Sequence, residues 1–221
     1  MKHDEDIDAG RAPLSRQLII DAAVSFADTS GLEVLSMRKL GAELGVEAMS
    51  LYNHIENKED ILNGMVDYVF RSISLPVGDL EWKEELRQLA TSLMDCFTAH
   101  SWMLSLKSAH THMGSGMLVF LERLLTILGD AGFNDEDAHH ALQMLGSHAS
   151  GYAFQQASSL ETSETQEVDV ESMLAQLGDE FPNVTRMAPY LAECDFTTEY
   201  SFGLDIIIDG LASRLDASRA G

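Results

Sequence analysis

The stretch that decides the fold is Leu35–Asp60, which reads LSMRKLGAELGVEAMSLYNHIENKED. Its apolar residues are spaced so that they can meet in one small core, with Leu51 and Ile55 on the same helix face at positions i and i+4. The residues that we expect in this core are Leu40, Leu44, Val46, Leu51 and Ile55. Two short helices that share such a core predict a helix-turn-helix.

Local signals set the expected bounds of these helices. Ser36 can cap a helix that runs through Leu44, and Gly45 suits the left-handed turn after it. A second short helix is expected from about Ala48 to His54. Asn57, which is followed by Lys58 and two acidic residues, is a strong N-cap for a helix that ends near residue 72.

With Leu51 and Ile55 buried, the other face of the second short helix projects outward. The residues expected on that face are Met49, Ser50, Tyr52 and Asn53. A helix of this size fits the major groove of DNA. Basic residues and a histidine lie around it, where phosphates would be: Arg38, Lys39, His54 and Lys58. An ordinary pair of helices that meet at a corner fits the same spacing equally well, and Met49 can instead pack partly into the core.

Helical periodicity covers most of the chain, and no alternating strand pattern of useful length occurs, so the predicted fold class is all-α. We divide the chain into a disordered tail over residues 1–14, a three-helix helix-turn-helix domain over residues 15–73, and a larger all-helical domain over residues 80–221. The break between the two domains falls at 74–79, which reads SLPVGD.

In the larger domain, the apolar stripes and caps predict several helices and one mobile loop. The expected helices begin near Trp82, Ser101, Met117 and Asn134, and further ones cover about 170–177, 184–193 and 196–217. The helix from Ser101 should end near Thr111, and the helix from Asn134 near Ser158. The polar, acidic stretch 159–169 is expected to be the mobile loop.

The charge balance opposes nucleic-acid binding by the molecule as a whole. The 221 residues hold 14 basic and 36 acidic side chains, a net charge of -22. Through Phe70 there are 6 basic and 13 acidic residues, net -7, and from Arg71 onward 8 and 23, net -15. DNA binding must therefore depend on a few local cations, with the acidic residues turned elsewhere.

Other features of the composition limit the class of protein. No apolar run is long enough to span a bilayer, and the acidic start does not resemble a signal peptide, so we expect a cytoplasmic protein with no membrane partner. Cys96 and Cys194 lie far apart without a CxxC spacing, which favours free, buried thiols over a disulfide framework or a zinc site.

The segment from about Ser15 to Phe70 resembles the tetracycline-repressor (TetR) family of transcriptional regulators. The resemblance rests on LIIDAAVSFADTSGLEVLSMRKLGAELGV, on Leu51-Tyr52-Asn53-His54, and on Asn57-Lys58 at the start of the next helix. It implies that the second short helix reads DNA and that Tyr52 and Lys58 contact the backbone. It also implies that Arg38 reaches a guanine, whose two major-groove acceptors match a guanidinium.

The reading positions depart from the pattern of the tetracycline repressors themselves. Where they have Gln-Pro-Thr and then Trp, this chain has Ala48-Met49-Ser50 and then Asn53. Asn53 can bond an adenine, and Met49 can touch a thymine methyl group. The operator sequence therefore does not carry over from the family.

The rest of the chain resembles the ligand-binding and dimerisation domain of tetracycline repressors, on Trp82-Lys83, Gly132-Phe133-Asn134, Gly146-Ser147-His148 and FGLDIIIDGLASRL. The last helix is apolar on more than one side, and the helix over about 135–158 has a small-residue face, so the regions near 135–158 and 196–217 predict a homodimer. A homodimer implies a palindromic operator in double-stranded DNA. We expect a small-molecule effector to release the protein from its operator. The helix over 57–72 is the expected lever between the effector site and the DNA-binding domain.

The expected effector site combines aromatic and Met side chains with polar residues. Its proposed members are Phe97, His100, Met103, His110, Met113, Met117, His148 and Gln155. Ordinary core packing explains the apolar members equally well. The chain lacks the His-Leu-Gly-Thr-Arg-Pro run of tetracycline repressors, so an aromatic or amphipathic molecule other than tetracycline is expected.

Two other functional classes fit single features of the sequence. Glu136-x-x-His139, repeated by Asp137 and His140, has the spacing of carboxylate–histidine metal sites in helical bundles, but a second pair and two facing glutamates are missing. The acidity also fits a helical interaction module that does not bind DNA. We expect no enzyme activity, no cofactor and no metal site.

Overall fold

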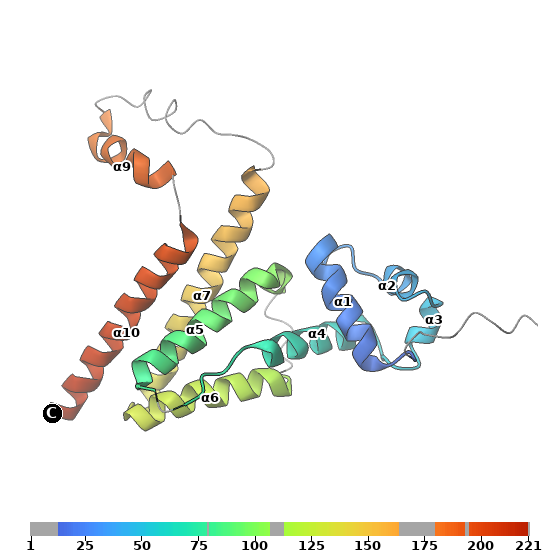
Figure 1. Ribbon diagram of the computed structural model, residues 1–221, viewed down its shortest axis with the longest axis horizontal. Coiled ribbons are helices and arrows are strands. Elements are labelled where there is room, and N and C mark those ends of the chain that lie inside the picture. Colours follow the sequence, from blue (N-terminus) through green and yellow to red (C-terminus); the bar gives the residue numbers. More distant parts are fainter. Residues whose placement is uncertain (1–12, 79, 107–112, 164–179, 193–194, 221) are drawn as a thin grey trace, which may run out of the picture.

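The protein is all-α in its computed structural model, which describes residues 13–78, 80–106, 113–163, 180–192 and 195–220. The described residues form α-helices and one 3-10 helix, with no strand (Figure 1). The four N-terminal helices are α1 Arg16–Ser30, α2 Met37–Glu43, α3 Ala48–Leu51 and α4 Lys58–Ser72. The others are α5 Trp82–Ala99, η1 Ser101–Ser105, α6 Ser115–Ala131, α7 Asp135–Ser163, α9 Pro182–Ala192 and α10 Phe196–Ala220.

The first four helices, which we call the head, form one end of the molecule (Figure 1). Side-chain caps begin three of them: the Ser15, Ser36 and Asn57 oxygens accept from the backbone N–H three residues on. Helix α4 packs against α1 in the head and against α6 beyond it. Gly64 allows α4 to pack closely on α1, since a Cβ at this position would lie 2.5 Å from the Ile20 side chain.

The helices from α5 onward, which we call the body, form the rest of the molecule (Figure 1). Helix α5 packs against α6, α7 and α10. Gly132, at φ 99°, ends α6 in the left-handed conformation, and the Asn134 side chain caps α7. The Tyr200 hydroxyl of α10 donates to the Ala90 carbonyl at 2.7 Å, and burial, together with the nearby Asp95, raises the pKa of this phenol. None of the described helices is long and apolar enough to span a membrane.

The expected helix bounds are confirmed most closely in the head, and the corrections fall where caps are weak. Helix α3 ends at Leu51 and continues only as turns to residue 54, because the N–H groups of Asn53 and His54 bond to carbonyls three residues back, those of Ser50 and Leu51. The expected helix from Ser101 is a 3-10 helix that ends at Ser105. Helix α7 continues to Ser163, so the first five residues of the predicted loop 159–169 are helical. The expected helix 170–177 lies outside the described residues.

The thiol of Cys96 is buried and free, as expected. Burial, with a smaller contribution from the charge of Asp95, raises its pKa to about 12. A thiol with this pKa stays protonated near neutral pH and is a poor nucleophile. Cys194 lies outside the described residues.

A small residue is required where α2 crosses α3. A Cβ added to Gly41 would lie 2.9 Å from the Val46 carbonyl oxygen and 3.2 Å from the Ala48 backbone. Because backbone atoms cannot move aside cheaply, Gly41→Ala should lower the free energy of unfolding by about 1 to 3 kcal/mol. Thermal denaturation checks this, with Gly129→Ala as the control, since a Cβ there meets nothing within 4 Å. A melting temperature of Gly41→Ala at or above the parent value would refute the tight crossing.

Candidate nucleic-acid interface

The helix-turn-helix is closed by the predicted core residues. Leu40 and Leu51 are completely buried, and Ile55 and Leu44 are nearly so, whereas Val46 is partly buried and packs against this core. The turn between the helices uses Gly45 at φ 60°, in the left-handed region. The N–H of Val46 donates to the carbonyl of Gly41 at 2.9 Å and ties α2 to the turn that leads into α3.

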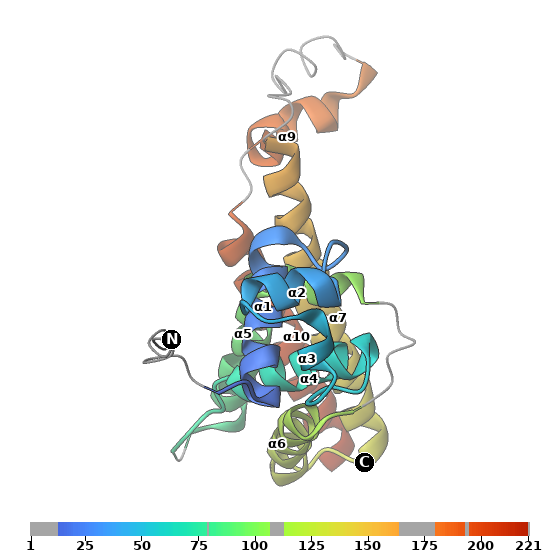
Figure 2. The same ribbon diagram turned by 90° about the vertical axis from the view of Figure 1, so that its right-hand side faces the viewer.

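The opposite face of α3 and the turn after it point into solvent at the end of the head, which faces the viewer in Figure 2. Met49 is 75% exposed and Tyr52 is 46% exposed, and Asn53 and His54 are exposed as well. Ala48 and Ser50 are half-buried. Met49 is therefore not a core residue, and large side chains project from a short helix and the turn after it.

The basic residues around α3 differ in how they are held. Arg38 is exposed and makes no ion pair within the part of the chain that the structure describes. The Lys39 ammonium lies 5.9 Å from the centre of the Phe26 ring, a cation–π contact with α1. Lys58 Nζ donates to the Leu35 carbonyl at 2.8 Å. No motif or spacing in the sequence indicates this bond, which links the start of α4 to the loop before α2.

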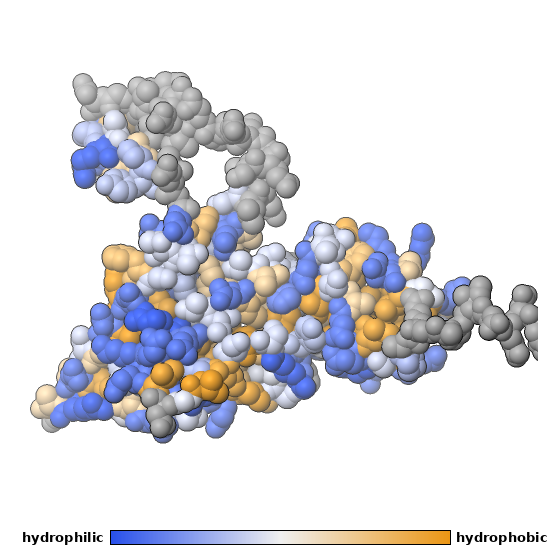
Figure 3. All heavy atoms as spheres, viewed as in Figure 1, coloured by the Kyte–Doolittle hydropathy of each residue, from blue (hydrophilic) through white to orange (hydrophobic). Residues whose placement is uncertain are grey.

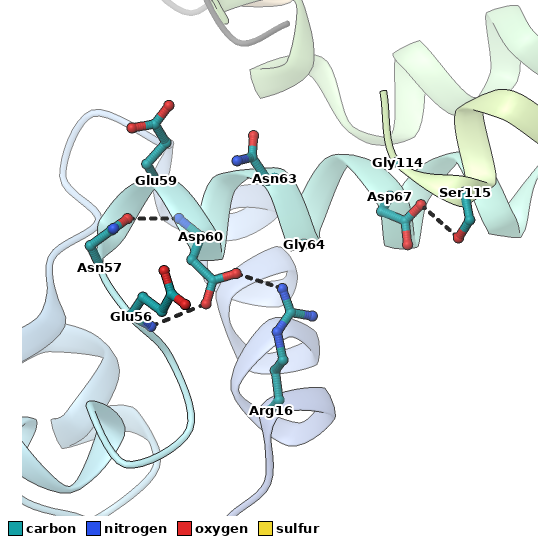
Figure 4. A pocket seen from close by; sticks show the side chains of 10 residues that line it. All are labelled: Arg16, Glu56, Asn57, Glu59, Asp60, Asn63, Gly64, Asp67, Gly114 and Ser115. Carbon is teal, nitrogen blue, oxygen red and sulfur yellow. Dashed lines mark hydrogen bonds and ion pairs between the residues drawn. The ribbon is translucent and has the colours of Figure 1, made fainter. Parts of the chain in front are cut away.

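A polar groove lies behind the exposed face of α3, between α1, α4 and the start of α6 (Figure 4). Its side chains pair with one another: Arg16 Nη2 donates to Asp60 Oδ1 at 2.7 Å, and the Glu56 N–H donates to Asp60 Oδ2 at 3.1 Å. Burial alone would raise the pKa of Asp60, but the bonds from Arg16 and Glu56 outweigh it and lower the pKa. The bond between Arg16 and Asp60 thus fixes the start of α4 on α1.

The residues predicted for an effector site differ in their burial. Phe97, Met103 and Met117 are partly buried and pack against the hydrophobic core. Met113 is 56% exposed and Gln155 is exposed. His110 lies outside the described residues. Packing against the core agrees with both interpretations of this spacing, ordinary core packing and the lining of an effector site.

The two described histidines of this set are both engaged by hydrogen bonds. His100 Nδ1 donates to Asp28 Oδ1 of α1 at 2.8 Å, and His148 Nε2 donates to the Tyr200 carbonyl at 2.9 Å. The His148 ring also stacks on the Tyr200 ring, with centroids 4.7 Å apart. His100 therefore joins body to head, and His148 joins α7 to α10.

One polar residue that joins α7 to α5 was not singled out from the sequence. Gln156, and not Gln155, faces α5, where its Oε1 accepts from Thr98 Oγ1 at 3.1 Å. The signal was present in the sequence, because Leu145, Ala149 and Tyr152 continue at helical spacing to residue 156.

Three cavities lie elsewhere, and none is lined by a residue predicted for the effector. The polar groove at the tip of α4 has a volume of about 550 Å³. A cavity of about 320 Å³ lies between α4 and α6, against Phe70 and Phe120. A cleft of about 410 Å³ lies between the end of α1, η1 and α7.

The carboxylate–histidine motif lies at the N-terminal end of α7, where Asp137 stabilises the start of the helix. Asp137 accepts a bond from Arg214 of α10 at 2.7 Å, and its N–H donates to the Asn134 cap. Glu136 and His140 are 4.0 Å apart on the surface. Among the described residues, no group of three or more His, Cys, Asp or Glu side chains is placed to hold a metal ion.

Comparison with known proteins identifies both parts of the chain. The family model for "Bacterial regulatory proteins, tetR family" matches residues 19–65, and the model for "Tetracyclin repressor-like, C-terminal domain" matches residues 75–215. The HTH-type transcriptional repressor DrrR1 of Streptomyces coeruleorubidus is 31% identical over 235 aligned positions, which cover 97% of this chain and 85% of the relative. Tetracycline repressor protein class E of Escherichia coli is 26% identical, covering 94% and 95%.

Solved structures of the regulator ActR from Streptomyces coelicolor share the fold of this chain. Apo ActR from Streptomyces coelicolor superposes with a TM-score of 0.78 at 28% identity, over 95% of this chain and 100% of that one. ActR in complex with actinorhodin gives a TM-score of 0.77 at 28% identity, over 92% and 99%.

Proposed function

Because this chain belongs to the tetracycline-repressor family of bacterial transcriptional regulators, we propose that it is a homodimeric repressor whose two heads bind a palindromic operator and that a small molecule bound in the body releases it. The observation that carries this proposal is the outward face of α3, where Met49, Tyr52 and Asn53 are exposed around a buried Leu51. A site of this kind works on chromosomal DNA, so the protein acts in the cytoplasm.

We assign DNA contacts to the residues on and around α3 by the chemistry of their side chains. Arg38 has the exposed, forked guanidinium that suits a guanine, and Asn53 and Met49 suit an adenine and a thymine methyl group. Tyr52, Lys39, His54 and Lys58 surround them at places suited to phosphates, and Ala48 and Ser50 allow close approach to the groove. Few phosphates are neutralised in this arrangement, so the salt dependence of binding should be shallow.

The dimer contact that we propose is the outer face of α7 and α10, which lie side by side. Three large apolar residues are exposed there: Phe202 is 65%, Ile206 59% and Met144 47% exposed. A Cβ at Gly151 or Gly210 would meet nothing within 4 Å, so this face is open to a close neighbour. Figure 3 shows hydrophobic surface on the body where α10 forms its edge. A second copy would bury this surface in a four-helix contact.

Helix α4 is the proposed lever, because it is fixed to the head at one end and to the body at the other. Asp67 of α4 holds the start of α6: its Oδ1 accepts from the Gly116 N–H at 2.6 Å, and its Oδ2 pairs with Arg71 at 2.9 Å. A Cβ at Gly116 would lie 2.5 Å from the Asp67 carbonyl oxygen. A shift of α6 on effector binding therefore moves α4.

Removal of the Asp67 carboxylate should loosen this joint. Asp67→Ala leaves the N-terminus of α6 without its acceptor and should lower the free energy of unfolding by about 1 to 2 kcal/mol. That is a melting temperature lower by roughly 2 to 8 °C, since about 1 kcal/mol corresponds to roughly 2 to 4 °C in a chain of this size. Glu122→Ala is the matched control, because Glu122 is an exposed acid within α6. Equal melting temperatures for the two variants would argue against the joint.

The proposed effector is an aromatic or amphipathic small molecule, with Phe97, Met103, Met113 and Met117 as its apolar contacts and His100, His110, His148 and Gln155 as its polar contacts. Support comes from the apolar character of this part of the body and from the 28% identical ActR, whose structure was solved with actinorhodin. An effector that favours a conformer with misplaced heads by roughly 1 to 3 kcal/mol would weaken operator binding about 5- to 150-fold.

Selection of bound duplexes from a random pool tests the proposed function. We expect a two-fold symmetric sequence whose half-sites lie about one helical turn apart, since the two α3 helices must enter successive major grooves. If no sequence is enriched at low salt, the protein is instead a helical interaction module without DNA binding. Cell-free transcription from a promoter that contains the selected sequence should fall when the protein is added, and a rise would identify an activator.

A further inference from the structure

The cleft of about 410 Å³ lies where the head meets the body. Asp28 and Glu33 line it from the head, Trp102 and Leu104 from η1, and Phe154 from α7. Figure 1 shows the C-terminal end of α1 beside the end of α5, next to which η1 begins. An occupant of this cleft would therefore contact head and body at once.

The carboxylate of Asp28 holds the inner wall in place. Its Oδ1 accepts from Trp102 Nε1 at 2.7 Å and from His100 Nδ1 at 2.8 Å. Its Oδ2 has no hydrogen-bond partner among the described residues, and the side chain remains 27% exposed. One carboxylate oxygen is thus used to orient the ring of Trp102, and the other remains available at the cleft.

The rest of the lining is acidic or aromatic. Glu33 is exposed and forms no ion pair with any residue that the structure describes. Phe154 is 61% exposed, an unusual state for a phenyl ring on a helix. No Lys or Arg is among the residues that line the cleft. The cleft therefore offers two carboxylates and aromatic surface, and the basic group beside them in the described part of the chain is the imidazole of His100, which bonds Asp28.

We propose that this cleft binds an organic ammonium ion that carries an aromatic or alkyl group, at a site separate from the effector site proposed above. A cation is attracted both by the two carboxylates and by the faces of aromatic rings, whereas an anion is repelled by the same groups. The apolar part of such a molecule can lie against Phe154 and Leu104, and the volume is in the range of small-molecule sites.

The binding test uses the two tryptophans of the chain. Trp82→Phe leaves Trp102 as the single tryptophan, and a phenyl ring can keep the edge contact that Trp82 makes with Phe133. The probe is benzyltrimethylammonium, titrated into the dimeric protein at constant ionic strength while the fluorescence of Trp102 is recorded. We expect a saturable change with this cation and none with 3-phenylpropionate, an aromatic anion of similar size.

Substitutions then locate the bound probe. Glu33→Gln and Phe154→Leu should each raise the Kd for benzyltrimethylammonium by about 3- to 5-fold, through loss of one charge contact or one ring face. Glu43→Gln is the matched control, since Glu43 is an exposed acid of α2 outside the cleft, and its Kd should equal that of the parent. The proposal is overturned if the probe does not saturate, if the anion binds equally well, or if neither Glu33→Gln nor Phe154→Leu weakens binding.

Discussion

Replacement of Ile206 by aspartate should turn the protein into a monomer and lower its affinity for the selected operator by at least about 100-fold. Ile206 is 59% exposed on α10, beside Phe202 on the same face, and neither residue is covered by the described parts of its own chain. A carboxylate in the proposed four-helix contact would have to lose its hydration, which prevents association. One head alone then lacks the gain in affinity of about 10²- to 10⁴-fold that linkage of two binding units provides.

Sedimentation velocity measures the dimer, and fluorescence anisotropy of a labelled operator measures binding. Leu125→Asp is the matched control, because Leu125 is also an exposed apolar residue, 42% exposed, but lies on α6, away from the proposed contact. It should leave the protein dimeric with normal operator affinity. A dimeric Ile206→Asp would show that α10 is not the dimer contact.

The second large effect is expected at Arg38. Arg38→Ala should reduce the preference for the selected operator over its single-base variants by about 5- to 150-fold at one position, since one bidentate contact with guanine discriminates by about 1 to 3 kcal/mol. Arg38 is exposed and unpaired among the described residues, so its removal costs the fold little.

Lys58→Ala provides the comparison. It should weaken the binding of all sequences alike and reduce the slope of log affinity against log salt by about 1, as expected for one phosphate contact. Lys58 Nζ also donates to the Leu35 carbonyl, so circular dichroism should first establish that the head stays folded. The measurement is fluorescence anisotropy at several salt concentrations. Both protein variants are titrated against the operator and against its single-base substitutions. Equal losses of preference in the two variants would contradict this division between base and phosphate contacts.

Local signals made the head predictable from the sequence. Ser36 and Asn57 cap their helices through bonds that span only three residues, and Gly45 adopts the left-handed turn that its position indicated. The exposed face of α3 followed from the burial of Leu51 and Ile55 four residues apart. These features depend on short separations along the chain, where spacing fixes geometry.

The body was less predictable because its contacts are non-local. The bond between His100 and Asp28 joins residues 72 positions apart, and no helical stripe encodes it. Phe97 and Met117 pack against the core with the spacing that a cavity lining would also have. The end of α7 was predicted near Ser158 but lies at Ser163, because no glycine or proline interrupts the polar sequence between them.

The most direct test of a dimer that reads two half-sites is the dependence of affinity on their separation. Five base pairs inserted at the centre of the selected duplex turn the second half-site to the opposite side of the DNA, so only one α3 can dock. Anisotropy titration at fixed salt should then show an affinity lower by at least about 100-fold. An affinity that is unchanged by the insertion would contradict reading of the operator by two symmetric heads.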